Sequence, residues 1–170
     1  MVEYFLSGAV EARVDGARAA LGGPKQRCVL AVLLADHGTV VSNDRLIDCV
    51  WDDGPPPKAL ASLRSYVTNL RRALDTGTAV DSAQGKRVES RPHGYQLNLL
   101  DGDSVDLHQF EALVSAGRAA LIRSDPAGAA GMLGEALALW RGDPFGEFAY
   151  RDFAAPDVVR FTALGTTAIE

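Results

Sequence analysis

Residues 58–74 combine hydroxyl, amide and guanidinium side chains on one face of an expected helix. Apolar residues at helical spacing form the other face: Ala59, Leu63, Tyr66, Val67, Leu70 and Leu74. The polar face holds Lys58, Ala61, Ser62, Ser65, Thr68, Asn69 and Arg72, with Arg64 and Arg71 on its flanks. Arg can pair with guanine and Asn with adenine, and small residues let a helix approach base edges. A solvated structural helix more often mixes Glu with Lys, so this face favours DNA recognition; a structural helix with a few surface arginines is the alternative.

A charged hairpin is expected shortly after this helix. Residues 86–91 and 95–99 are predicted strands, joined by a turn at Pro92-His93-Gly94. The hairpin carries three cations and one titratable ring near this turn: Lys86, Arg87, Arg91 and His93. Such side chains suit contact with phosphates or insertion into the minor groove of DNA. A charged hairpin by itself is usually only a solvent-exposed hairpin. Its position shortly after a polar helix is what favours a role in DNA binding.

The preceding residues predict the elements that would position this helix. Residues 2–6, 9–14 and 17–21 favour three short antiparallel strands, with a turn at Asp15-Gly16. A helix is expected from Lys25 to His37 and a second one from Ser42 or Asn43. Residues 52–57, with three prolines, form a loop. Three helices followed by a hairpin are the elements of an α+β winged helix-turn-helix.

The composition changes at Asp101-Gly102-Asp103, where we expect a domain boundary. Downstream, two Ala-rich helices joined by Ser124-Asp125-Pro126 resemble a tetratricopeptide-type hairpin. A third helix is expected over residues 157–170. We therefore predict a winged-helix domain at 1–100 and an all-α segment at 101–170. One and a half hairpins leave an apolar face uncovered, so this segment is expected to be the first part of a longer domain.

The net charge of −5 is unevenly distributed along the chain. Residues 1–100 hold 12 Lys/Arg and 11 Asp/Glu, whereas residues 101–170 hold 5 and 11. Local clustering matters more for phosphate binding than the total, so the average charge does not exclude DNA. No apolar run reaches the roughly 20 residues that span a bilayer, and a signal peptide is not evident. The sequence predicts a cytoplasmic, nucleoid-associated protein without a membrane partner.

The sequence gives no motif for catalysis, a cofactor or a metal ion. His37, His93 and His108 lie in different expected elements, without metal-ligand spacing to one another or to Cys28 and Cys49. The segment Gly22–Lys25 lacks phosphate-loop spacing, and no nucleophile motif is present. We expect a protein that is not an enzyme and binds no cofactor or metal.

Several segments resemble the SARP-type antibiotic regulatory proteins, transcription activators of actinobacteria. In the first domain they are residues 22–27, 41–48 with Trp51, 65–74, and the hairpin sequence at 91–95. Residues 106–110 and 136–142 resemble the start of that family's bacterial transcriptional activation domain. The segments cover nearly the whole chain in order, and together they are specific although each alone is weak.

The resemblance implies an OmpR-type winged helix that binds direct repeats in double-stranded promoter DNA. Side-by-side protomers, a possible homodimer on DNA, would recruit RNA polymerase holoenzyme. The predicted base contacts are Ser65, Thr68, Asn69 and Arg72, and the predicted backbone contacts are Lys25, Arg27, Lys58, Arg64 and Arg71. Asp52, Asp53 and Gly54 occupy the place where OmpR-type proteins meet polymerase, although a plain connector explains them equally well. The alternative function is a protein-interaction module whose winged helix is a scaffold and does not bind DNA.

Overall fold

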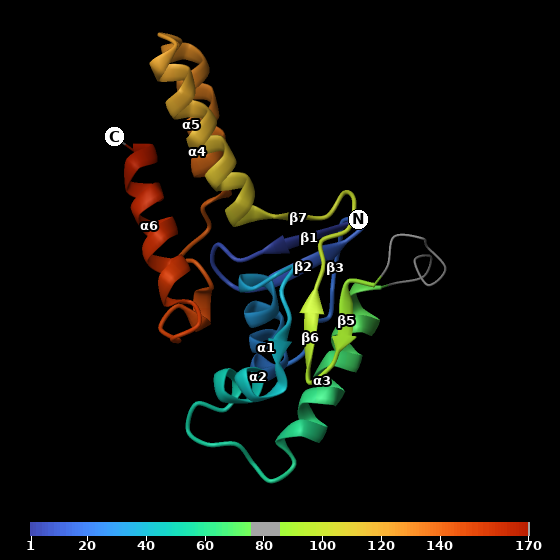
Figure 1. The fold of residues 1–170 in the computed structure, drawn as a ribbon. Coiled ribbons are helices and arrows are strands. Elements are labelled where there is room, and N and C mark those ends of the chain that lie inside the picture. Colours follow the sequence, from blue (N-terminus) through green and yellow to red (C-terminus); the bar gives the residue numbers. More distant parts are fainter. Residues whose placement is uncertain (76–85, 170) are drawn as a thin grey trace.

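The computed structural model describes residues 1–75 and 86–169 (Figure 1). Residues 76–85, which are polar and rich in turn formers and are therefore predicted from the sequence to form a loop or flexible segment, lie outside this range. The first sheet has the strand order β3-β2-β1-β7, from β1 (Val2–Phe5), β2 (Glu11–Val14), β3 (Ala17–Arg18) and β7 (Ser104–Val105). Strands β1, β2 and β3 form the antiparallel meander expected from the sequence, with the turn at Asp15-Gly16. Along β1 and β2 the side chains of Val2, Tyr4 and Ala12 point into the core.

Three helices follow the meander, as predicted: α1 (Pro24–Ala35), α2 (Asn43–Val50) and α3 (Ala59–Leu74). Helix α1 is buried along most of its length, and both other helices pack against it. After α1 the chain passes through Gly38 at φ +76°, a left-handed conformation that favours glycine. Ser42 caps α2, since its Oγ accepts a hydrogen bond from the Arg45 amide at 3.1 Å.

The expected hairpin forms a second antiparallel sheet with the segment between α1 and α2. Its strand order is β4-β6-β5, from β4 (Val41–Ser42), β5 (Val88–Arg91) and β6 (Gly94–Leu97). A Cβ at position 94 would overlap the carbonyl oxygen of Val41. Glycine there allows the close pairing of β4 with β6, which fixes the hairpin beside the helices.

The C-terminal part is helical, with α4 (Asp106–Ile122), α5 (Pro126–Leu139), the 3₁₀ turn η2 (Gly146–Phe148) and α6 (Ala155–Ile169). Helices α4 and α5 form a hairpin that projects from the first domain, and α6 packs against both (Figure 1). A Cβ at Gly117 of α4 would lie 2.9 Å from the Leu133 side chain of α5, so glycine lets the two helices approach closely. Within the described residues, no helix is long and apolar enough to cross a bilayer.

The segment at the expected domain boundary belongs structurally to both parts. Strand β7 pairs in parallel with β1 and continues directly into α4. At the start of α4, the carboxylate of Asp106 is buried and accepts hydrogen bonds from the Leu6 and Ser7 amides at 2.8 and 3.0 Å. Burial raises the pKa of this carboxyl above its ordinary value, although these hydrogen bonds oppose the rise. The helical part is therefore fastened to the first sheet.

Candidate nucleic-acid interface

Helix α3 presents its polar face to solvent, as the sequence predicted. Leu63, Val67, Leu70 and Leu74 are buried. The exposed residues of the helix are Leu60, Ala61, Arg64, Ser65, Thr68, Asn69 and Arg72, and Lys58 is exposed at the N-cap. No described residue forms an ion pair or side-chain hydrogen bond with the guanidinium of Arg64 or Arg72. The helix therefore offers two cations that no described residue pairs with, together with small and polar side chains.

Two polar side chains on this face make contacts within the protein. The Thr68 hydroxyl donates to the Arg64 carbonyl oxygen at 3.0 Å, and its oxygen can still accept a hydrogen bond. The Asn69 Nδ2 donates to the Gln26 Oε1 at 3.1 Å. Both residues remain exposed. Their predicted base contacts are thus compatible with the positions that the structure gives them.

Arg71 connects α3 to the hairpin. Its Nε donates to the Val88 carbonyl oxygen at 2.9 Å and its Nη2 donates to the Ser90 Oγ at 2.8 Å. The guanidinium also lies 5.8 Å from the centre of the Tyr95 ring. These contacts hold β5–β6 against the flank of the helix, so Arg71 sets the position of the hairpin. Its contact with the DNA backbone stays a prediction.

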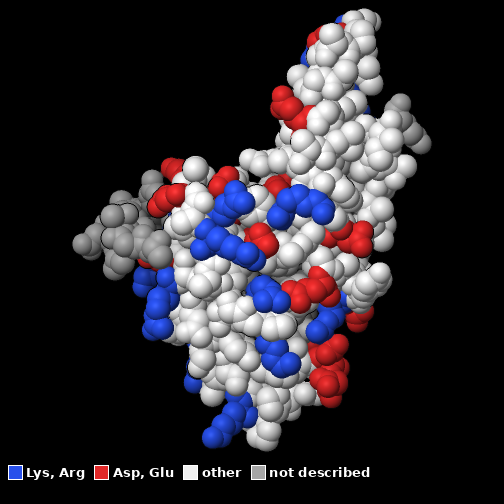
Figure 2. Space-filling view, turned by 180° about the vertical axis from the view of Figure 1, so that it is seen from behind, with Lys and Arg blue, Asp and Glu red and all other residues white. Residues whose placement is uncertain are grey.

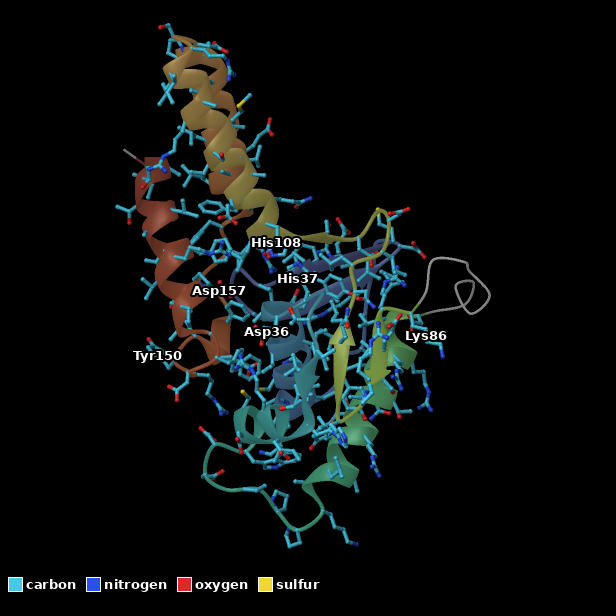
Figure 3. The ribbon with its side chains drawn as sticks, in the orientation of Figure 1. Asp36, His37, Lys86, His108, Tyr150 and Asp157 are labelled. Atoms are coloured by element: carbon cyan, nitrogen blue, oxygen red, sulfur yellow. The ribbon has the colours of Figure 1, made fainter. Side chains whose placement is uncertain are left out.

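The hairpin exposes three of the four residues predicted for the wing, Lys86, Arg91 and His93. Figure 3 shows Lys86 just before β5, at the end of the hairpin away from its turn. Arg91 pairs with Glu89 of its own strand at 2.6 Å. His93 lies in the turn at φ 60°. The side chains of Lys86 and His93 have no hydrogen-bond or ion-pair partner among the described residues, so both are available for contacts outside α3.

Arg87 corrects the sequence-based prediction, because it is buried and cannot reach DNA from this position. Its Nε and Nη2 donate to the two carboxylate oxygens of Asp103 at 2.8 and 2.9 Å, and Nη1 lies 3.4 Å from Asp75. Burial raises the pKa of the Asp103 carboxyl, but hydrogen bonds from Arg87 and two backbone amides outweigh burial and lower it overall. Arg87 therefore joins the end of α3 to the segment before β7.

The two cations at the start of α1 lie in different surroundings. Lys25 is exposed, as a phosphate contact requires. The Arg27 Nη2 lies 2.8 Å from the Glu147 carboxylate of η2, and its Nη1 donates to the Gly22 carbonyl oxygen at 2.9 Å. A phosphate contact by Arg27 would have to compete with the ion pair to Glu147, which links α1 to η2.

The loop after α2, predicted to meet polymerase, is exposed at Asp52, Asp53 and Gly54. Its first residue contacts the C-terminal part, since Arg151 Nη1 lies 3.0 Å from the Asp52 carboxylate. The same nitrogen donates to the Cys49 carbonyl oxygen at 3.1 Å, near the end of α2. The base of the loop is thereby fixed, and Asp53 and Gly54 remain outward.

His37 and His108 meet where the two domains touch, although the sequence places them in different elements. Their ring centroids are 4.8 Å apart, and Figure 3 shows both between α1 and the helical part. The pKa of His108 is lowered, first by burial and then by His37. No group of three or more candidate ligands for a metal ion occurs within residues 1–75 and 86–169.

The charged side chains of the first domain are mixed in sign. Figure 2 shows Lys and Arg spread over that domain with Asp and Glu between them, and fewer charged side chains on the visible face of the projecting helical hairpin. The contacts that sequence reasoning missed involve Gln26, Glu147, Arg151 and Asp103. Each joins residues far apart in the chain, and no local pattern marked them.

Two family models match this chain in succession. The model described as "Transcriptional regulatory protein, C terminal" matches residues 18–97, and "Bacterial transcriptional activator domain" matches residues 105–170. The transcriptional regulatory protein MoaR1 of Mycobacterium tuberculosis is 36% identical over 146 residues, which is 86% of this chain and 46% of MoaR1. The regulatory protein AfsR of Streptomyces coelicolor is 36% identical over 142 residues, 84% of this chain and 13% of AfsR. The chain thus spans less than half the length of these relatives.

A solved structure has the same fold over nearly the whole chain. Mycobacterium tuberculosis EmbR, solved in complex with a low affinity phosphopeptide, superposes with a TM-score of 0.83 and 30% sequence identity. The match covers 98% of this chain and 43% of the EmbR chain. This confirms the predicted fold class, a winged helix followed by a helical segment.

Proposed function

This chain belongs to the SARP-type family of transcription activators, in which an OmpR-type winged helix precedes a bacterial transcriptional activator domain, and we propose that it binds direct repeats in promoter DNA and recruits RNA polymerase holoenzyme. The family consists of transcriptional regulators and not of enzymes.

The observation that carries the proposal is the exposed polar face of α3, which lies beside a hairpin that Arg71 holds in place. Exposed Arg72 and Asn69 have the donors and acceptors that read guanine and adenine in the major groove. Ser65 and Thr68 lie on the same face and are small enough for close approach. Arg64 and Lys58 are exposed as well, and we assign them to contacts with the DNA backbone. The hairpin that Arg71 holds carries Lys86, Arg91 and His93 toward the neighbouring phosphates.

Polymerase recruitment is assigned to the loop after α2. Asp53 and Gly54 are exposed on a segment whose base is held by the Arg151–Asp52 ion pair and whose end contains three prolines. A loop with fixed ends loses less conformational freedom when it binds a partner. Two protomers side by side on a direct repeat would present two such loops.

Titration of the protein against its own upstream promoter DNA tests the proposal. Fluorescence anisotropy is measured at two salt concentrations, with random duplex as competitor. We expect binding that survives the competitor and weakens steeply with salt, because each neutralised phosphate releases counterions. If the folded protein binds no duplex at low salt, the proposal is wrong and the protein-interaction module becomes the better explanation.

A further inference from the structure

Gln26 has a buried side-chain amide that both donates and accepts a hydrogen bond. It is the third residue of α1 and only 7% exposed. Its Nε2 donates to the Leu21 carbonyl oxygen at 2.8 Å, and its Oε1 accepts the hydrogen bond from the Asn69 Nδ2 at 3.1 Å. The backbone before α1 is thereby linked to the middle of the exposed face of α3.

The backbone around Gln26 leaves room for this arrangement. Gly22 has φ +77°, and a Cβ at that position would lie 2.6 Å from the Gln26 Nε2. A side chain at position 22 would therefore be strained and would also displace the amide. The hydrogen bond to Leu21 fixes which end of the Gln26 amide faces Asn69, since only Nε2 can donate to a carbonyl oxygen. Gln26 consequently presents an acceptor to α3.

This acceptor determines the orientation of the Asn69 amide. If the amide turned by half a rotation, the Asn69 Oδ1 would face the Gln26 Oε1, and two acceptors would repel each other. In the observed orientation Asn69 keeps one N–H of Nδ2 and its Oδ1, and no described residue bonds to that oxygen. One donor and one acceptor are what a bidentate contact with the N7 and N6 of adenine requires.

Solvent reaches Asn69 and Gln26 through an open groove of about 520 Å³. Its walls include Gly22 and Ala20 on one side and Asn69, Arg72 and Ala73 of α3 on the other. The pair thus lies at the edge of the surface to which we assign base contacts, and not inside the core.

We propose that Gln26 is a positioning residue for sequence specificity, which holds the Asn69 amide in the orientation that selects adenine. The inference rests on the proposed function, in which α3 reads bases. It assigns a role to a residue that does not touch DNA itself. Gln26 acts before binding, because the amide of Asn69 is already oriented in the free protein.

The test compares two variants at position 26 with the parent protein by their base preference. The parent first selects its operator from a library of random duplexes, and Asn69→Ala identifies the base pair whose preference depends on Asn69. Dissociation constants are then measured on that operator and on duplexes with each other base pair at this position. Gln26→Met loses the contacts with both Asn69 and Leu21. Gln26→Glu loses the contact with Leu21 but keeps an acceptor for Asn69.

We expect Gln26→Met to reduce the preference for adenine about tenfold, within the range for one bidentate base contact. Gln26→Glu should retain the preference, although its added charge weakens binding to every duplex. Gln26→Met should have no further effect on base preference in the Asn69→Ala background, as in a double-mutant cycle. A purely structural role would instead affect both variants alike, since both lose the bond to Leu21.

Urea unfolding of each variant separates specificity from stability. If Gln26→Met does not fold, Gln26→Ser takes its place, because serine is too short to reach Asn69 and leaves space for water beside Leu21. An unchanged adenine preference in a folded variant that cannot reach Asn69 overturns the inference and leaves the proposed function intact. Failure of the parent to select any sequence overturns the proposed function itself.

Discussion

The junction between the two domains and the exposed face of α3 both carry arginine, but in different surroundings. At the junction, Arg27, Arg87, Arg141 and Arg151 each lie within 3.7 Å of a carboxylate. Their partners are spread over η2, the segment before β7, β2 and the loop after α2. On α3, no described carboxylate pairs with Arg64 or Arg72. The same residue type thus fastens one region and is left available in the other.

The difference shows that the partner of a cation, and not its type or its place in a motif, indicates what the cation does. A guanidinium that already has a carboxylate partner would need to lose that partner before it could contact a phosphate. An unpaired exposed guanidinium can bind a phosphate or a base edge without such a loss. The comparison therefore predicts effects on stability for the junction and effects on DNA binding for α3.

Arg87→Ala should have the largest effect, and the effect should be on folding. The substitution leaves the Asp103 carboxylate, whose side chain is fully buried, without its cation. Breaking a buried pair in this way costs about 3–5 kcal/mol. Urea unfolding should show a loss of that size, while Lys86→Ala on the exposed neighbour should change stability by less than about 0.5 kcal/mol. Equal stability of the two variants would contradict a structural role for Arg87.

Arg72→Ala should change DNA binding and leave the stability of the fold nearly unchanged. Its guanidinium is exposed and unpaired among the described residues, so folding loses no ion pair. Discrimination between operator and random duplex should fall by about 1–3 kcal/mol, as expected for a lost base contact. Competition titrations with both duplexes measure this difference. A variant that binds both as the parent does would show that Arg72 lies outside the recognition face.

Local sequence patterns were sufficient for the elements of the first domain. The apolar spacing of Leu63, Val67 and Leu70 predicted which face of α3 is buried, because a helix with one apolar stripe can bury only that stripe. The sequence offered Ser42 or Asn43 as the start of α2, and Ser42 is the cap because its hydroxyl accepts a hydrogen bond from an amide that the helix leaves free. These features depend on residues at most a few positions apart.

Long-range contacts were not predictable in the same way. Strand β7 has only two residues, too few for a sequence pattern, and it pairs with β1, about 100 positions earlier in the chain. The pairing of Arg87 with Asp103 depends on how the hairpin returns to the first sheet, and in the sequence Arg87 looks like any other wing cation. The bond between Gln26 and Asn69 spans 43 positions, so neither residue alone indicated it.

Arg64→Ala should distinguish contacts with the DNA backbone from contacts with bases. The side chain is exposed on the flank of α3 and unpaired among the described residues. We expect weaker binding to operator and random duplex by the same factor, because phosphates carry no sequence information. The slope of log K against log salt should decrease by about 1. Anisotropy titrations over a series of salt concentrations measure both quantities, and a selective loss on the operator alone would instead make Arg64 a base contact.

His108 extends the comparison to a group at the junction that titrates. Burial is the main cause of its lowered pKa, and His37 and Arg160 lower it further, whereas Glu111 and Asp157 act in the opposite direction. In the unfolded chain the ring has its ordinary pKa of 6.5. Below about pH 6.5 the unfolded state therefore binds a proton that the folded state does not, and stability falls as the pH falls.

His108→Gln should remove this part of the acid sensitivity, which is the smallest of the expected effects. The urea midpoints of the parent and the variant are measured from pH 7.5 to 5. Between these pH values the midpoint should fall less in the variant than in the parent. His37→Gln should weaken the acid sensitivity only in part, since it removes the second cause of the lowered pKa and leaves burial in place. DNA affinity at pH 7.5 should be the same in all three proteins, because neither ring lies on the recognition face. If the parent and His108→Gln lose stability in parallel on acidification, other groups at the junction carry the pH dependence, and the contact between the two rings has no part in it.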